Sequence, residues 1–178
     1  MNAGAGKGLY DEGLSAADTD HWPSAKLTSI DDLSSVTVRG RGRPRNTRRS
    51  PTPSAEAWFE GTVTLAIPGK ELTGYVSWNR AYQSWLVEFF EAIVSSSEGW
   101  QGEMAHVTQD DDLRLRATFL EGNRALVDAR VLDWWDPQGE RGAKFKQSEL
   151  RGELTVTFEA VTKFASELRR TMNDFSSP

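Results

Sequence analysis

Every second residue along positions 58–67 is apolar or glycine, and the same alternation resumes along positions 72–78. A period of two residues is typical of a strand with one buried face. Pro68 and Gly69 lie between the two stretches. Proline presets the first central position of a tight turn and glycine accepts the positive φ of the second. The sequence therefore predicts a hairpin over residues 58–78.

The hydrophobic period then lengthens to that of a helix over residues 80–97, which end in serines and are followed by Gly99. Apolar side chains recur every three or four positions, with polar residues between them. They are Trp85, Leu86, Phe89, Phe90, Ile93 and Val94. This stretch is predicted to form an amphipathic helix.

Alternation returns in residues 103–108, 113–120 and 125–135, which turn-forming residues separate, so a three-stranded meander is expected. Residues 150–157 predict a last strand. Thr157 can cap a closing helix with a single apolar stripe. The order ββαββββα predicts an α+β fold: a single antiparallel sheet of about six strands with two helices on one face.

Residues 1–55 follow neither period and are rich in Gly, Ser, Asp and Arg, with prolines at 51 and 53. Such a segment buries too little surface to offset the entropy of ordering it. We predict a disordered arm and Pro-rich linker over residues 1–55, followed by one folded domain over residues 56–178.

Composition excludes several chemistries. The 178 residues include no Cys and two His, His21 and His106, which argues against disulfides, thiol nucleophiles, zinc fingers and His-rich metal sites. We expect no cofactor and no metal. The sequence shows no signal peptide and no apolar stretch of membrane-spanning length, so it predicts a cytoplasmic protein without a membrane partner.

The formal net charge of −5 is unevenly distributed. Residues 1–55 carry 8 basic and 6 acidic side chains, whereas residues 56–178 carry 13 basic and 20 acidic ones. The arm is therefore suited to a polyanion, and the acidic body is suited to a basic protein surface.

A short motif in the arm, Arg41-Gly42-Arg43-Pro44, is flanked by further arginines. It resembles the AT-hook, a peptide that orders on DNA. The resemblance implies that Arg41, Gly42 and Arg43 enter an A·T-rich minor groove and that Pro44 directs the chain outward. Two alternatives remain: a generic solvated arm, or an arm that lies partly upstream of the true start.

No arrangement of residues in the domain predicts catalysis. His106 has no second His near it in the sequence, so a structural or exposed role is expected. The three aspartates at 110–112 predict a solvated turn, because calcium loops space their ligands over about 12 residues. Arg114 and Arg116 are expected to form cross-strand ion pairs with the neighbouring strand.

Aromatic residues suggest a binding surface instead. Trp134 is expected on the outer face of its strand together with Leu132, with Trp58 joining from the hairpin. Trp is enriched at interface hot spots, so Leu132, Trp134 and Trp58 are candidate partner-binding residues. The alternative is that the loop over residues 136–148 folds back and covers them.

Phe89-Phe90, the turn Gly99-Trp100-Gln101-Gly102 and the strand segment 112–117 together resemble an uncharacterised family of small bacterial domains of unknown function. The resemblance spans about residues 61–172. Members usually carry a His soon after that strand, where this chain has Phe119 and Glu121. In size and element order the family is similar to immunity proteins, which bind and neutralise toxins.

These observations lead to one hypothesis with two alternatives. We expect a non-catalytic binding module with a protein partner, of the kind of an immunity-like inhibitor. The first alternative is a DNA-associated protein that uses the AT-hook-like arm. The second is an enzyme that relies on carboxylates alone, which would need two acids in one pocket with shifted pKa values.

Overall fold

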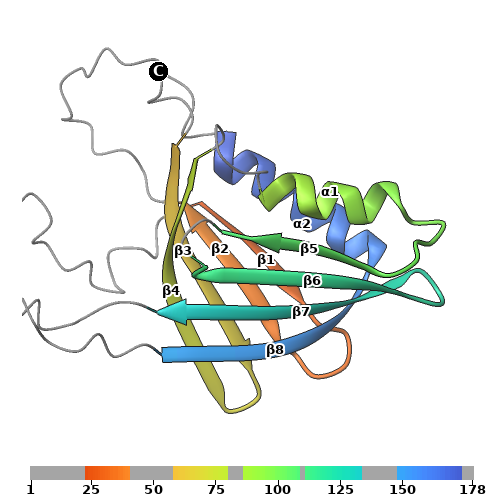
Figure 1. Cartoon of the computed structure of the whole chain (residues 1–178), viewed down its shortest axis with the longest axis horizontal. Coiled ribbons are helices and arrows are strands. Elements are labelled where there is room, and N and C mark those ends of the chain that lie inside the picture. The colour runs from red at the N-terminus through yellow and green to blue at the C-terminus, as the bar shows by residue number, and fades with distance from the viewer. Residues whose placement is uncertain (1–22, 41–57, 80–85, 109–110, 134–147, 174–178) are drawn as a thin grey trace, which may run out of the picture.

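The computed structural model describes residues 23–40, 58–79, 86–108, 111–133 and 148–173, apart from the side chains at 58–60, 77–79 and 173. These residues form eight strands and two helices (Figure 1). In chain order they are β1 (Ser24–Thr28), β2 (Ser35–Gly40), β3 (Trp58–Ile67), β4 (Lys70–Asn79), α1 (Leu86–Ser95), β5 (Glu103–Val107), β6 (Leu113–Leu120), β7 (Arg124–Asp133), β8 (Ser148–Thr157) and α2 (Phe158–Asn173).

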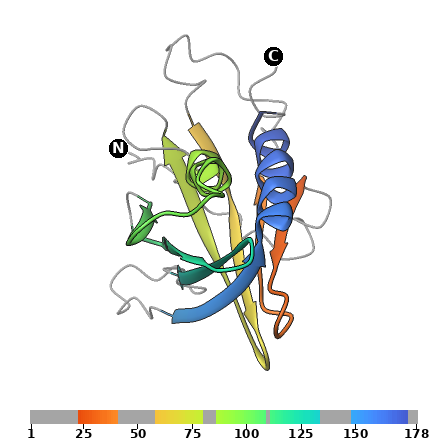
Figure 2. The same ribbon diagram turned by 90° about the vertical axis from the view of Figure 1, so that its right-hand side faces the viewer.

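The strands form two antiparallel four-stranded sheets, ordered β1-β2-β3-β4 and β5-β6-β7-β8. The strands of the second sheet cross those of the first, and the two helices lie together along one side (Figures 1 and 2). The prediction of a single six-stranded sheet is therefore wrong, although the α+β class and the order of elements from residue 58 onward are confirmed. The chain leaves the first sheet at β4 and enters the second only after α1.

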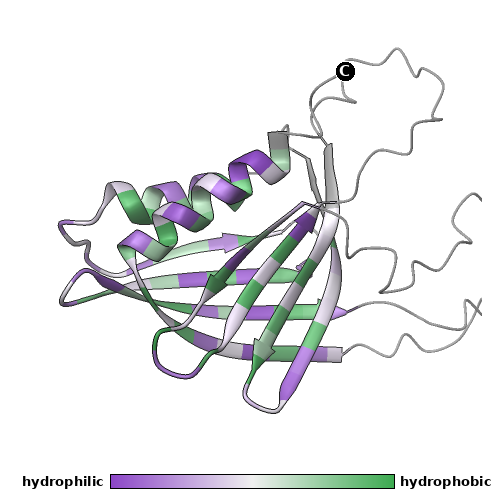
Figure 3. Ribbon diagram, turned by 180° about the vertical axis from the view of Figure 1, so that it is seen from behind, coloured by the Kyte–Doolittle hydropathy of each residue, from purple (hydrophilic) through white to green (hydrophobic). Residues whose placement is uncertain are grey.

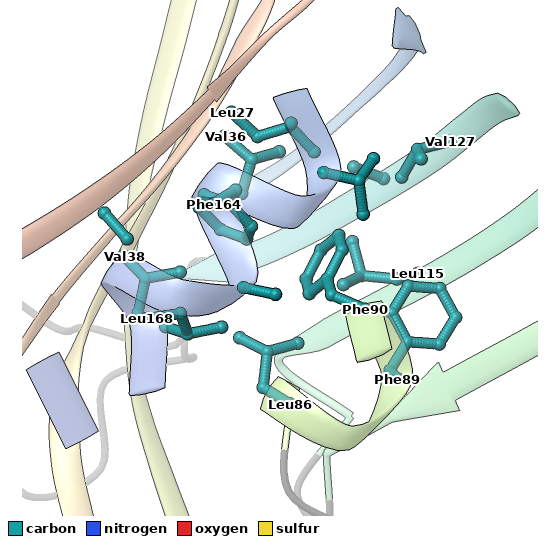
Figure 4. Close-up of a cluster of buried hydrophobic side chains, with 14 of the residues drawn as sticks. Leu27, Val36, Val38, Leu86, Phe89, Phe90, Leu115, Val127, Phe164 and Leu168 are labelled. Atoms are coloured by element: carbon teal, nitrogen blue, oxygen red, sulfur yellow. The ribbon is translucent and has the colours of Figure 1, made fainter. Parts of the chain in front are cut away.

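The predicted disorder of residues 1–55 is wrong for residues 24–40, which form the hairpin β1–β2 and pair with β3. Leu27, Val36 and Val38 are at most 2% exposed. They point toward Phe164 and Leu168 of α2 (Figure 4). The two strands are short and their buried residues pack against elements far along the chain, α2 among them, so the local pattern was too weak to reveal them.

The core lies between the sheets and the helices. Phe90 of α1 meets Phe164 of α2 edge to face, with ring centroids 4.7 Å apart. The inner residues of the strands complete this core, and hydrophobic and hydrophilic positions alternate along each strand (Figure 3). On the surface, Glu91 and Arg169 join the two helices by an ion pair. The helices are thus held to each other as well as to the sheets.

Two glycines let the sheets approach closely. A Cβ at residue 74 of β4 would lie 2.5 Å from the carbonyl oxygen of Leu132, and a Cβ at residue 152 of β8 would lie 2.4 Å from Cγ2 of Ile67. Real Cβ atoms do not come that close to other heavy atoms. Glycine at position 74 is therefore a condition of the packing between the sheets, because the close neighbour is backbone, whereas a Cβ at position 152 would require the Ile67 side chain to move.

The predicted local signals are confirmed where the structure describes them. Ile67 pairs with Lys70 across the turn, and Gly69 has a φ of 76°. The Thr157 hydroxyl accepts a hydrogen bond from the Ala160 amide at 3.2 Å, which caps α2 as predicted. Each signal acts within a few residues, which is why the sequence alone reveals it.

Candidate functional site

The predicted site residues are only partly covered by the structure. Arg41, Gly42, Arg43, Pro44 and Trp134 lie outside the described residues, as does the side chain of Trp58. No contact among them is therefore described, and the loop proposed to cover Trp134 lies outside as well.

Leu132 does not form the exposed surface that the sequence predicted, because its exposed fraction is 1%. Its amide donates to the carbonyl oxygen of Asp112 at 2.8 Å, and β4 packs against β7 at this point through Gly74. The alternation of side chains along β7 places Leu132 on the outer face of the sheet. It is nevertheless enclosed, because β7 is an inner strand and Leu132 lies beside both the turn at Asp112 and strand β4 of the other sheet. Leu132 is therefore not available to a partner.

The outer face of the second sheet carries a row of arginines in cross-strand register. Arg114 of β6 lies opposite Arg130 of β7, which lies opposite Arg151 of β8. Asp111 bridges Arg114 and Arg130, and Glu149 bridges Arg130 and Arg151. The distance from Arg130 Nη1 to Asp111 is 3.3 Å and that from Nη2 to Glu149 is 3.2 Å. We call these five residues the arginine row.

Electrostatics in the arginine row keep its acids charged. The hydrogen bond from Arg114 lowers the pKa of Asp111, and hydrogen bonds from Arg151 and Arg130 lower the pKa of Glu149. A carboxyl group whose pKa falls is a poor proton donor near neutral pH. The row links the outer faces of three strands by ion pairs and is not suited to acid–base chemistry. Arg116, the other predicted partner, pairs with Glu103 at 3.6 Å.

A buried polar cluster closes the turn between β5 and β6. Thr108 donates to the Asp112 carboxylate and accepts from the Leu113 amide at 3.0 Å. Asp112 is 5% exposed, so the predicted solvated turn is wrong at this aspartate. Its carboxylate points inward because it can accept the threonine hydroxyl. His106 of β5 lies two residues before Thr108 and therefore faces the same side as its side chain. It is 4% exposed, and its ring centroid lies 6.0 Å from that of Phe89.

Burial lowers the pKa of the His106 imidazole from 6.5 to about 4. The folded protein therefore keeps this ring neutral, while the unfolded chain takes up a proton as the pH falls below about 6.5. Stability from this residue is complete above that pH and decreases until the pH reaches about 4. We expect the free energy of unfolding to fall by about 2 kcal/mol between pH 7 and pH 5.

Urea unfolding at the two pH values measures this loss. His106→Gln serves as the control, since it removes the titrating group and should flatten the dependence, whatever its effect on absolute stability. The same slope in both proteins would show that other groups are responsible. Asp111 and Glu149 have lowered pKa values, so their contributions are lost at lower pH.

An acidic surface lies around α1 and β5. No lysine or arginine occurs between Arg80 and Arg114, whereas seven acids do. Glu88 on α1, Glu98 just after it and Glu103 on β5 are exposed. The helix packs over β5 through Phe89 and His106, which brings the two elements side by side (Figure 2). We call Glu88, Glu98 and Glu103 the acidic surface. Counting charges by segment would have revealed this run of acids in the sequence, but not that α1 and β5 lie side by side.

The glycine–tryptophan turn between α1 and β5 has a structural role. Gly99 and Gly102 have φ values of 119° and 82°. These backbone conformations turn Trp100 inward against Phe119, with ring centroids 5.4 Å apart, and toward Phe158 at 6.3 Å. The most distinctive motif in the sequence therefore packs the connection between α1 and β5 against β6 and α2.

Together these features define a small α+β domain built on two crossed antiparallel sheets, with an acidic surface at one side. The chain belongs to a family of unknown function, DUF6228, whose model matches residues 47–174. The match begins after β2 and includes the glycine–tryptophan turn. No curated protein and no solved structure matches the chain.

The described residues offer neither a membrane span nor a cluster of metal ligands. Neither of the two helices is long and apolar enough to cross a membrane. Within the same residues, no group of three or more His, Cys, Asp or Glu side chains is placed to hold a metal ion.

Proposed function

We propose that this protein is a non-catalytic binding module whose acidic surface engages a basic surface of a protein partner. The observation that carries the proposal is the excess of exposed carboxylates on α1 and β5, since the segment between Arg80 and Arg114 has no lysine or arginine. Glu103 pairs with Arg116 of β6 at 3.6 Å, but both side chains are about half exposed, so solvent weakens this pair. Such a segment attracts a basic partner and repels an acidic one. An immunity-like inhibitor of a basic toxin is one form of this function.

Affinity capture from a lysate of the source cells tests the proposal. The bait is the full chain, compared with Glu88→Lys plus Glu98→Lys. A matched control, Glu121→Lys plus Glu159→Lys, makes the same charge change at exposed positions elsewhere. We expect a basic protein to be captured by the chain and the control, and at least about tenfold less by the first variant. The captured protein should also bind the purified chain, and this binding should weaken at high salt.

Two results would overturn this function: capture of the same protein by all three baits, or the absence of any captured protein. A fluorescent A·T-rich duplex, added to the same baits, tests the alternative function. Its retention, with loss on Arg41→Ala plus Arg43→Ala, would favour the DNA-associated protein instead, because those arginines supply the contacts to the groove.

A further inference from the structure

Strand β5 is an outer strand of its sheet, since it pairs with β6 on one side only. The other three outer strands, β1, β4 and β8, are packed against further elements within the described residues. Helix α2 packs along β1, and β4 and β8 pack against strands of the opposite sheet. In Figure 2, β5 lies at the margin of the second sheet, away from α2. The margin at β5 is thus a place where the sheet could be extended.

The hydrogen-bond register shows which backbone groups face outward. The Thr108 amide donates to the carbonyl oxygen of Leu113 at 3.0 Å, and the ladder continues from there with His106 opposite Leu115. Opposed residues of an antiparallel ladder alternate between bonded and non-bonded pairs. The N–H and C=O groups of the odd-numbered residues, Glu103, Ala105 and Val107, therefore point away from β6.

The side chains of the same three residues are exposed, and Val107 has 46% of its surface in contact with solvent. A strand with outward backbone groups and an exposed β-branched residue is a template for a further strand. Charged residues often block such margins, yet here the only charged side chain on the strand is Glu103.

We propose that β5 binds an extended, basic segment of the partner by strand addition, which gives the second sheet a fifth strand. This inference rests on the proposed function and assigns it a site and a partner chemistry. Charge selects the occupant. A second copy of the chain would bring a second acidic surface to the same margin. Lysines or arginines on one face of an added strand would instead lie near Glu103, and those on its other face would lie on the side of the sheet where α1 packs.

The probe is a synthetic peptide of about seven residues in which lysine and valine alternate. This length is enough to pair with the whole of β5, which spans 5 residues. The matched peptides replace lysine by glutamate, or keep lysine and carry N-methyl groups on alternate amides. The first changes charge alone and the second removes backbone donors alone. Fluorescence anisotropy measures the affinity for the full chain, and hydrogen exchange locates the binding.

On the protein, Ala105→Pro removes one outward N–H that β6 does not use, so the edge of the sheet can tolerate it. We expect this substitution and N-methylation each to weaken binding by about tenfold or more, because each removes one or two backbone hydrogen bonds between β5 and the peptide. Ala105→Val keeps the N–H and should bind as the natural chain does. The amides of Ala105 and Val107 should gain protection when the peptide binds.

Charge variants separate this inference from the proposed function. Glu103→Lys should weaken binding, and Glu153→Lys on the far strand of the same sheet should not.

Binding that responds to charge but not to Ala105→Pro or N-methylation would overturn strand addition and leave the protein-binding function standing. No binding of the basic peptide, with a captured partner retained, would overturn the choice of an extended segment. A dimer of the chain that Ala105→Pro dissociates would show that a second copy is the occupant. If Ala105→Pro fails to fold, the N-methylated peptide decides.

Discussion

Leu27→Ala is expected to lower the free energy of unfolding by about 2–5 kcal/mol, which is the usual cost of emptying a fully buried leucine site. Leu27 lies in β1, is 1% exposed and belongs to the same core as Phe164 of α2. Truncation to alanine leaves a cavity between the first sheet and α2, and the surrounding strands relax only partly. Urea unfolding monitored by tryptophan fluorescence measures the change.

Lys26→Ala is the matched control, because Lys26 is the exposed neighbour on the same strand. It should change the stability by less than about 0.5 kcal/mol. Equal effects of the two substitutions would mean that the hairpin β1–β2 does not belong to the core. A chain that begins at residue 56 provides a second measurement. It should be strongly destabilised, since it loses Leu27, Val36 and Val38 together.

Gly74→Ala is expected to destabilise the protein more than Gly152→Ala, the other substitution that adds a Cβ between the two sheets. The new Cβ would lie 2.5 Å from the carbonyl oxygen of Leu132 and 3.0 Å from Cγ1 of Val131. The first contact is with backbone, so no side-chain rotation relieves it and the sheets must separate. Overpacking of this kind costs about 1–3 kcal/mol and sometimes more. A lower thermal midpoint and a lower urea midpoint are the readouts.

Two controls identify the cause of that loss. Glu71→Ala, at an exposed position on the same strand, should have little effect. Gly152→Ala should cost less than Gly74→Ala, because its nearest neighbour is Cγ2 of Ile67, a side chain that is only partly buried and can move. A Gly74→Ala protein as stable as the natural chain would show that the sheets do not meet here as described.

Surface ion pairs should contribute little by comparison. Most residues of the arginine row are at least a third exposed, and such pairs are weakened by solvent and salt. Arg130 differs, because its side chain is 17% exposed and its Nε is buried without a hydrogen-bond partner among the described residues. The stability of this protein therefore depends mainly on the core and on the close approach of the sheets.

Short-range patterns were enough to locate most elements. The alternation in β3, β6 and β7, the helical stripe of α1 and the cap at Thr157 each act within a few residues, and each is confirmed in the structure. The same patterns placed His106 in a strand of the meander, and the absence of Cys from the sequence excluded cysteine chemistry. The charge balance of residues 56–178 likewise needed no structure, although its concentration on α1 and β5 did.

Long-range contacts decided the rest. The alternation along β4 and along β5 does not show whether these two strands pair with each other. The same alternation is compatible with one continuous sheet and with two separate sheets, and the structure has β4 and β5 in different sheets. The sequence alone does not show that Gly74 and Gly152 lie against the opposite sheet, and it places Leu132 on the outer face of its strand, where its neighbours in fact enclose it.

The amino-acid sequence alone determined the type, order and approximate bounds of the elements after residue 58, because hydrophobic periodicity and turn chemistry are local. Only the tertiary structure decided that residues 24–40 complete a sheet and that the described strands form two sheets. It also decided that β5, among those strands, pairs on one side only and lies beside the acids of α1. Those outcomes depend on contacts between residues far apart in the chain, where burial and close packing outweigh local preference.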